Sequence, residues 1–254
     1  MNYILEYWNA IQTGTVTVSK RVKKIYQKLA ADLDASDSEY IFDEAKACRP
    51  IDFIEQFTRH SKGEWAGKSV TLELFQKAYI SALFGFVHKE TGLRRYSETL
   101  FMVGRKNGKS TMLAGLALYM LMADNEPGAE VYSVATKKDQ ARLIFDEAHN
   151  MVQQSPHIGG LVKKRKTDLY FPMAMGKFQP LGKNSDTLDG LNAHCVIIDE
   201  LHAVRDRNLY EVMKQSQNAR RQPLLIMITT AGTVRECIFD DIYTYACSVV
   251  DGTI

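Results

Sequence analysis

The chain has 254 residues, of which 45% are hydrophobic and 24% are charged, and its formal net charge is +2. Such a composition belongs to folded globular proteins and excludes wholesale disorder. The near balance of charge also excludes a histone-like, polybasic protein, so nucleic-acid binding has to rest on local patches. The length allows one large domain or two small ones.

The sequence shows no membrane span and no secretion signal. Its longest apolar run, residues 112–123, is too short to cross a bilayer and predicts a buried helix instead. The N-terminus lacks the basic start and the long apolar stretch of a signal peptide. The four cysteines form no CxxC pair, which indicates reduced structural thiols and a location in the cytoplasm.

The first part of the chain, residues 1–92, is predicted to be mostly helical. Apolar residues recur at helical spacing in the stretches 20–33, 51–57 and 72–86. Beyond this part the pattern changes, and short apolar runs alternate with helical stretches. We therefore expect a helical lead-in that packs on a core formed by residues 93–254.

Strands and helices alternate along this core. The predicted strands are 99–103, 130–135, 196–199 and 224–229, and the predicted helices are 110–122, 137–153 and 209–218. Residues 168–171 and 177–181 flank a short turn and predict a hairpin. Apolar strands that alternate with helices predict an α/β fold with a mostly parallel central sheet flanked by helices.

The first core strand leads into a glycine-containing loop and then a helix that begins with GKST. Such a loop points backbone N–H groups inward and sets a helix N-terminus beneath a phosphate. Gly108 lets the backbone approach the oxygens, Lys109 reaches the β- and γ-phosphates, and the Ser110 hydroxyl binds Mg²⁺. The residues expected to bind ATP are Gly104, Arg105, Lys106, Asn107, Gly108, Lys109, Ser110 and Thr111.

This loop departs from the usual phosphate-loop pattern by one residue. Three residues separate Gly104 from Gly108 where four are usual, and Val103 occupies the usual glycine position. Residues 63–69 repeat the same GxxxGKS spacing, but no apolar strand precedes them, so we expect no phosphate role for Lys68. Residues 146–149 spell DEAH inside a predicted helix, and we assign them no chemistry.

Two acids follow the strand 196–199. Adjacent carboxylates at the end of an apolar strand are costly unless a cation or a reaction uses them. We expect Asp199 to hold Mg²⁺ and Glu200 to act as the general base that polarises the attacking water. His202 either couples this site to a neighbouring element or is a capping and packing residue.

The strand 224–229 also ends in polar residues, Thr229 and Thr230. Hydroxyl groups at this place can hydrogen-bond the γ-phosphate or the attacking water, and so sense which nucleotide is bound. The alternative is a strand that leads into an ordinary turn.

Several of these segments together resemble the ATPase domain of the large terminase subunit, the DNA-packaging motor of tailed bacteriophages. The matching segments are GRKNGKST, VATKKDQARLIFDEA, LDGLNAHCVIIDELHA and LIMITTAG, preceded by FIEQF and KGEWAGKSVTLELFQ. The likeness runs from about residue 10 to about residue 240. It implies a P-loop NTPase fold of the additional-strand, catalytic-Glu type, which hydrolyses ATP with Mg²⁺ to move double-stranded DNA into a procapsid.

The resemblance also implies roles for single residues. Gln76 matches the glutamine that reads the adenine edge, and Arg105 matches a basic residue that acts on the γ-phosphate in cis. Thr229, Thr230 and Gly232 match the motif that couples hydrolysis to movement. An arginine from a neighbouring subunit is the alternative to Arg105, and the candidates left open are Arg142, Arg205, Arg207, Arg220 and Arg221.

The partners implied by the resemblance are double-stranded DNA, a portal protein, a small terminase subunit and further copies of the chain. We expect a monomer in isolation, a ring during packaging, no membrane, and the cytoplasm of the infected or lysogenic bacterial host. The basic run expected to contact the DNA backbone is Lys163, Lys164, Arg165 and Lys166.

The large terminase subunits that the chain resembles also carry a C-terminal nuclease domain. We expect no nuclease activity from residues 1–254. Two other functions compete with the motor: a DEAH-like helicase or DNA translocase, and a nucleotide-binding assembly module that does not hydrolyse ATP. Separation of a forked duplex would favour the first, and tight ATP binding without phosphate release would favour the second.

Overall fold

The computed structural model describes residues 1–182, 188, 190–204, 207–230 and 237–254. The chain divides into two compact units. One unit contains Met1–Asp52, Thr71–Tyr96 and Tyr243–Ile254, and the other contains Phe53–Val70 and Ser97–Ile242. The expected boundary near residue 92 between a lead-in and a core stays a prediction.

The first unit is mainly helical. Its elements are α1 (Tyr3–Gln12), α2 (Lys20–Asp32), α4 (Leu74–Gly85) and a small antiparallel sheet of β1 (Tyr40–Phe42) and β2 (Phe86–His88). The predicted helices 20–33 and 72–86 are confirmed as α2 and α4. Their apolar faces meet α1 in a core of Ile4, Tyr7, Ile11, Tyr26, Leu29, Ala78, Ala82 and Phe86.

Helix α3 (Glu44–Phe57) begins in the first unit and ends in the second. It is longer than the predicted helix 51–57, because the helix continues through Pro50 rather than starting after it. The long C-terminal helix α8 (Ile238–Asp251) also runs from one unit into the other, and it was not predicted. Within the ranges described above, no helix is both long and apolar enough to cross a membrane.

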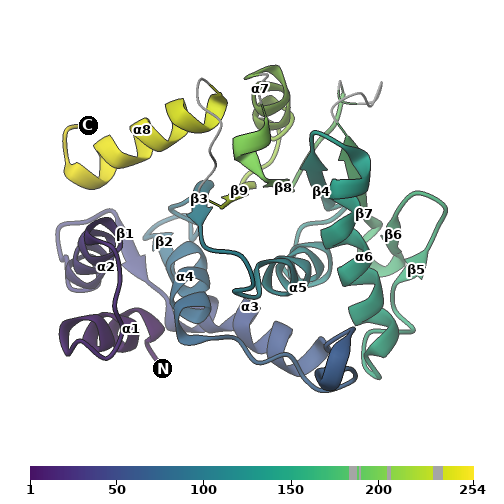
Figure 1. Ribbon diagram of the computed structural model, residues 1–254, viewed down its shortest axis with the longest axis horizontal. Coiled ribbons are helices and arrows are strands. Elements are labelled where there is room, and N and C mark those ends of the chain that lie inside the picture. The colour runs from purple at the N-terminus through teal and green to yellow at the C-terminus, as the bar shows by residue number, and fades with distance from the viewer. Residues whose placement is uncertain (183–187, 189, 205–206, 231–236) are drawn as a thin grey trace. The chain divides into compact units, whose positions relative to one another are not determined.

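The second unit is built on a seven-stranded sheet (Figure 1). Its strand order is β3 (Glu98–Met102), β9 (Leu224–Thr229), β8 (Cys195–Asp199), β4 (Glu130–Ala135), β7 (Gly176–Gly182), β6 (Leu169–Phe171) and β5 (Lys163–Lys164). The first five strands pair in parallel, and β6 pairs antiparallel with both β7 and β5. The predicted strands, the hairpin and the mostly parallel sheet are therefore confirmed.

Helices cover both faces of this sheet. Helices α5 (Lys109–Met122) and α6 (Lys138–Gln154) lie on one face, and α7 (Arg207–Gln215) lies on the other (Figure 1). The apolar run 112–123 forms most of α5, and its side chains are buried between the sheet and the end of α3. Gly115 allows this contact, because a Cβ at this position would lie 3.0 Å from Ile54 Cγ1.

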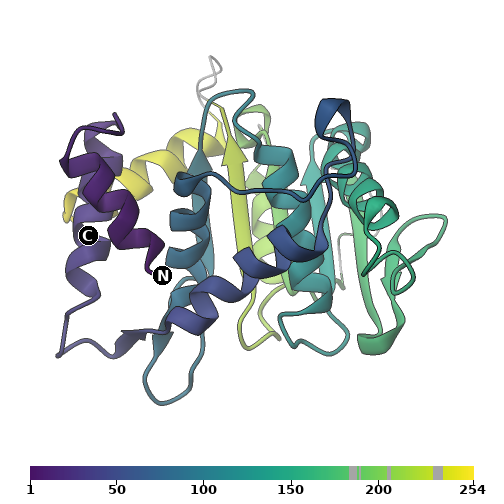
Figure 2. The ribbon, with the colours of Figure 1, turned by 90° about the horizontal axis from the view of Figure 1, so that it is seen from below.

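The parallel register brings several strand ends to one edge of the sheet, here called the carboxyl edge. Met102 at the end of β3 pairs with Thr229 at the end of β9, and Asp199 at the end of β8 pairs with Ile228. Figure 2 shows β9, in yellow-green, running toward this edge. The loops that follow these strands therefore emerge together, although they are far apart in the sequence.

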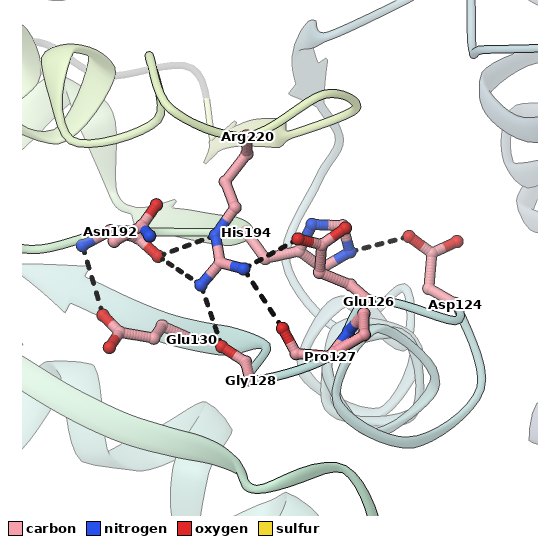
Figure 3. A network of polar contacts seen from close by, with 8 residues as sticks. All are labelled: Asp124, Glu126, Pro127, Gly128, Glu130, Asn192, His194 and Arg220. Atoms are coloured by element: carbon pink, nitrogen blue, oxygen red, sulfur yellow. Dashed lines mark hydrogen bonds and ion pairs between the residues drawn. The ribbon is translucent and has the colours of Figure 1, made fainter.

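The opposite, amino edge of the sheet is fixed by Arg220 (Figure 3). Its guanidinium donates to the Glu126 carboxylate and to the carbonyl oxygens of Pro127, Gly128 and Asn192, at 2.7–3.3 Å. These bonds use all five N–H groups of the side chain, which is only 10% exposed. Arg220 thereby joins the segments that precede β9, β4 and β8.

A buried pair of side chains reinforces the same edge. The imidazole of His194 lies 2.7 Å, Nε2 to Oδ2, from the carboxylate of Asp124, and the two side chains are 0% and 5% exposed. Nearby, the Glu130 carboxylate accepts hydrogen bonds from the Tyr132 hydroxyl and from the backbone N–H of Asn192. Breaking such buried polar pairs is costly, so we infer that this edge stabilises the fold.

Candidate active site

The predicted phosphate loop connects β3 to α5 at the carboxyl edge. Its backbone takes left-handed conformations at Lys106 and Gly108, with φ of 64° and 69°. The Asn107 amide nitrogen donates to the carbonyl oxygens of Gly104 and Arg105, at 3.2 and 3.3 Å. The loop is therefore braced by its own side chain, while every residue from Gly104 to Gly108 is exposed.

Helix α5 begins directly at the end of this loop. Gly108 is its N-cap, Lys109 is its first residue, and Ser110 is exposed at the second position. The first N–H groups of a helix have no acceptor within the helix, and the helix dipole favours an anion there. The shortened spacing between Gly104 and Gly108 thus still ends in a helix start that suits a phosphate.

The two predicted acids follow β8 at the same edge. Glu200 takes a left-handed conformation, with φ 51° and ψ 53°, and its backbone N–H donates to Asp199 Oδ1 at 2.9 Å. A non-glycine residue held in this region costs about 1–3 kcal/mol, and such strain is concentrated at functional sites. This conformation could not be predicted from the residue type, because glutamate rarely adopts it.

Charged groups from separate segments affect the pKa of Asp199. Burial raises the pKa of the Asp199 carboxyl above its usual value of 3.8. The Glu200 N–H opposes this rise, the negative charge of Glu200 adds to it, and the positive charge of Lys109 opposes it. Lys109 and Asp199, predicted separately from a loop and from a strand end, therefore lie close enough to interact.

His202 and Thr229 are also brought together. His202 lies in the short 3-10 turn Leu201–Ala203, and its Nδ1 is 2.7 Å from the Thr229 hydroxyl. The Val103 backbone N–H donates to the Thr229 carbonyl at 3.2 Å. Of the predicted coupling residues, Thr229 and Thr230 lie at the end of β9, whereas Gly232 lies outside the described residues.

Other predicted residues have contacts of their own. Gln76 is 4% exposed, and its side-chain oxygen accepts the Glu73 N–H at the start of α4, so its adenine role stays a prediction. Of the arginines left open, Arg142 and Arg207 pair with Asp146 and Glu211 on exposed helix faces. Arg220 has no N–H group left for a phosphate, and Arg205 lies outside the described residues.

The basic run beside the hairpin is partly used within the protein. The Arg165 guanidinium binds both carboxylate oxygens of Asp168, at 2.6 and 2.8 Å. The Lys164 ammonium lies 4.5 Å from the centre of the Phe145 ring. All four residues of the run are exposed, and their contact with DNA stays a prediction.

The two motifs for which we predicted no chemistry, residues 63–69 and residues 146–149, contact other side chains of the protein. The ammonium of Lys68 lies 4.6 Å from the centre of the Trp65 ring. Lys68 follows the short 3-10 turn Gly63–Trp65. Glu147, within the DEAH letters, lies in the middle of α6 and accepts a hydrogen bond from the Ser61 hydroxyl at 2.6 Å. Neither motif stands directly at the end of a strand of the central sheet, because Lys68 follows a 3-10 turn and Glu147 lies well inside α6.

The carboxyl edge offers groups that fit both a triphosphate and a divalent cation. The exposed helix start and Lys109 suit an anion, since backbone N–H groups and an ammonium both donate to phosphate oxygens. Asp199 and the Ser110 hydroxyl are oxygen ligands of the type that Mg²⁺ takes in nucleotide sites. A cation there would also compensate the burial of the Asp199 carboxylate.

The order of the sheet identifies the class of protein. Strand β9 lies between β3, which precedes the glycine loop, and β8, which precedes the acids; this is the P-loop NTPase fold with an additional strand. A model of the family described as "Terminase large subunit, ATPase domain" matches residues 74–248, more than half of the chain. The chain belongs to this family, and the resemblance in sequence and the predicted fold class are confirmed.

Two similar proteins are terminase large subunits of bacteriophages. The terminase large subunit of Enterobacteria phage HK97 is 28% identical over 188 residues, covering 72% of this chain and 36% of that protein. The terminase large subunit of Lactococcus phage p2 is 23% identical over 250 residues, covering 94% of this chain and 44% of that protein. The chain thus spans less than half the length of these relatives.

A solved structure supports the same relationship. The crystal structure of the HK97 bacteriophage large terminase superposes with a TM-score of 0.70 and 25% sequence identity. The superposition covers 81% of this chain and 42% of that one. The fold described above is therefore shared with a large terminase.

Proposed function

We propose that the chain hydrolyses ATP at the carboxyl edge of its central sheet. The observation that carries this proposal is the effect of the Lys109 charge on Asp199, which puts the start of α5 and the two acids at the same edge of the sheet. Membership of an ATPase-domain family supports it and favours it over a helicase.

Each residue at this edge has a proposed part in the reaction. The loop from Gly104 to Gly108, continued by Lys109, Ser110 and Thr111, holds the triphosphate, and Lys109 neutralises its β- and γ-oxygens. Ser110 and Asp199 hold Mg²⁺, which when bound would offset the negative charge that develops on the phosphates. Glu200 orients the attacking water and accepts its proton.

Arg105 is proposed to act on the γ-phosphate in cis. It is exposed in the loop itself, and a guanidinium suits the charge that develops during phosphoryl transfer. An arginine of a second copy remains the alternative, with Arg142, Arg207 and Arg221 as the candidates that the structure describes. Arg220 is not a candidate, because its donors are used at the amino edge.

We further propose that the cycle moves double-stranded DNA into a procapsid. The similarity to terminase large subunits of two bacteriophages supports this role. The work would take place in the cytoplasm of the bacterial host, in a ring of copies with a portal protein and a small terminase subunit. Contact through exposed Lys163 and Lys166 would weaken steeply as salt is raised, since it would involve phosphates rather than bases.

The chain contains a matched pair of lysines that tests the nucleotide site. Lys109→Ala should lower ATP turnover at least about a hundredfold and weaken ATP binding, because it removes the phosphate contact. Lys68→Ala, in the loop with the same GxxxGKS letters, should leave both unchanged. Turnover would be measured by phosphate release, and binding by titration calorimetry with Mg²⁺ present.

Three outcomes would contradict the proposal. Wild-type turnover in Lys109→Ala would remove the phosphate loop from the site. An equal loss of turnover in Lys68→Ala would show that a loop needs no preceding strand of the sheet to take part in ATP hydrolysis. ATP binding by the wild-type chain with no phosphate release, even with DNA added, would indicate a nucleotide-binding assembly module.

A further inference from the structure

His202 makes a connection that the reaction as proposed above does not use. It lies two residues beyond Glu200, and its Nδ1 is 2.7 Å from the hydroxyl oxygen of Thr229. The backbone N–H of His202 donates to the same oxygen at 3.4 Å. Thr229 is the last residue of β9 and is fully buried. One hydroxyl therefore holds the turn that follows the acids against the neighbouring strand.

The hydrogen bonds around this hydroxyl determine where the imidazole carries its proton. The Thr229 hydroxyl has a single hydrogen, and it is donated to the Thr230 carbonyl at 2.8 Å. Its oxygen therefore accepts from His202, so the Nδ1 of His202 is the protonated nitrogen. The imidazole is a donor to Thr229, and it stays one whether the side chain is neutral or charged.

Thr229 has a second contact, with the phosphate loop. Its carbonyl accepts the Val103 N–H at 3.2 Å, at the position where β3 leads into the loop. Its register partner in β3 is Met102. A single residue thus contacts the start of the phosphate loop through its backbone and the turn of Glu200 through its side chain.

The turn itself does not require the imidazole. Two backbone hydrogen bonds close it, from the Ala203 N–H to the Glu200 carbonyl and from the Val204 N–H to the Leu201 carbonyl, at 2.8 and 3.0 Å. Leu201 is fully buried and anchors it in the core. The side chain of His202 adds a second and shorter contact to Thr229, at 2.7 Å beside the 3.4 Å of the backbone N–H, and this argues against a simple capping role.

We propose that His202 is a positioning residue for ATP hydrolysis. Its hydrogen bond to Thr229 holds the turn of Glu200 in place relative to the phosphate loop and the end of β9. Because the backbone of Glu200 is in a strained conformation, its carboxylate depends on such external support for its position. The proposal rests on the proposed function, since it assumes that Glu200 is the base.

Substitutions of His202 separate positioning from other roles. His202→Ala should lower kcat about tenfold with little change in KM, because the phosphate contacts are made by the loop and not by this link. His202→Asn should restore most of the rate, since its amide nitrogen can take the place of Nδ1. His202→Gln, whose amide nitrogen corresponds to Nε2, should not. The unfolding temperatures of all three would be measured alongside.

A double-mutant cycle tests the link itself. Thr229→Val removes the hydroxyl with little change in shape and should lower kcat at least as much as His202→Ala does, because it also removes the acceptor of the His202 backbone N–H. Thr229→Ser keeps a hydroxyl and should lower kcat less than Thr229→Val. The double variant should be no slower than Thr229→Val alone, because Thr229→Val already removes the bond that His202→Ala removes. Additive losses, or a His202→Asn variant as slow as His202→Ala, would overturn the proposal.

A measurement that needs no turnover keeps this test separate from the test of ATPase activity. The chain has six histidines, and nitrogen-15 NMR of labelled histidine in the full chain at pH 8 reports which ring nitrogen is protonated. We expect the Nδ1–H form for His202 in the wild type and its loss in Thr229→Val. The Nε2–H form in the wild type would overturn the proposal, even if ATP is hydrolysed normally.

Discussion

The two edges of the central sheet use the same kinds of side chain in opposite ways. At the amino edge, Arg220 is 10% exposed and all its donors bind oxygens of the protein. At the carboxyl edge, Arg105 is exposed in a loop with left-handed backbone at Lys106. Acids differ likewise, since Asp124 is paired with His194 whereas burial raises the pKa of Asp199.

This difference separates stability from chemistry within one sheet. Polar groups that are satisfied inside the protein stabilise the fold, and groups held in strained or unfavourable states are available to a ligand. The comparison predicts that substitutions at the carboxyl edge reduce activity while sparing or raising stability. Substitutions at the amino edge should do the reverse.

The largest expected effect is at the base. Glu200→Gln should lower kcat about a thousandfold while ATP binding persists, because the amide cannot accept a proton from water but leaves the phosphate contacts intact. Phosphate release and calorimetric binding of ATP would be measured on the same preparation. Fast residual turnover combined with lost binding would assign Glu200 to the binding of ATP instead.

The next effect is on stability at the amino edge. Asp124→Ala should lower the free energy of unfolding by about 3 kcal/mol, because it leaves the fully buried His194 without its carboxylate. Chemical denaturation would measure it. The control, Asp146→Ala, breaks an ion pair whose partners are both 47% exposed and should cost no more than about 0.5 kcal/mol. Equal losses would remove the distinction between buried and exposed pairs.

A smaller effect, of opposite sign, is expected at the strained turn. Glu200→Gly should raise the free energy of unfolding by up to about 1 kcal/mol while it abolishes hydrolysis, since glycine adopts the left-handed conformation without strain. Glu147→Gly, in the middle of α6, should instead lower stability by at least about 1 kcal/mol. A loss of stability in Glu200→Gly would argue against stored strain.

The smallest effect concerns pH at the amino edge. Burial alone would raise the pKa of the Glu130 carboxyl, but hydrogen bonds from Tyr132, the Asn192 N–H and Lys177 outweigh it and lower the pKa below its usual 4.5. The stabilisation is therefore complete above about pH 4.5 and is lost as the pH falls through the lowered pKa. Glu130→Gln should show a shallower loss of stability on acidification, and an unchanged slope would contradict this.

Much of the fold could be predicted because its signals are local. The core strands are short and mostly apolar, and the apolar residues that predict α2, α5 and α6 lie in contiguous stretches. The loop before α5 and the two acids after β8 could likewise be recognised, because each consists of contiguous residues. The assignment of these residues to ATP, Mg²⁺ and DNA remains a prediction.

The features that could not be predicted are the ones that depend on distance in the sequence or on backbone strain. Asp124 and His194 are 70 positions apart, and Arg220 bonds to Glu126 over 94 positions, so neither pair has a local signature. The conformation of Glu200 runs against its residue type. The contact of His202 with Thr229 depends on the register of β8 and β9, which neighbouring letters of the sequence do not reveal.

The most direct test of the central claim is a crystal structure with Mg²⁺ and an ATP analogue that cannot be hydrolysed. The account predicts one triphosphate on the start of α5, with Lys109 at the β- and γ-phosphates and Asp199 and Glu200 facing the γ-phosphate. A triphosphate bound elsewhere, or one bound by Lys109 with Asp199 and Glu200 directed away from it, would contradict the account.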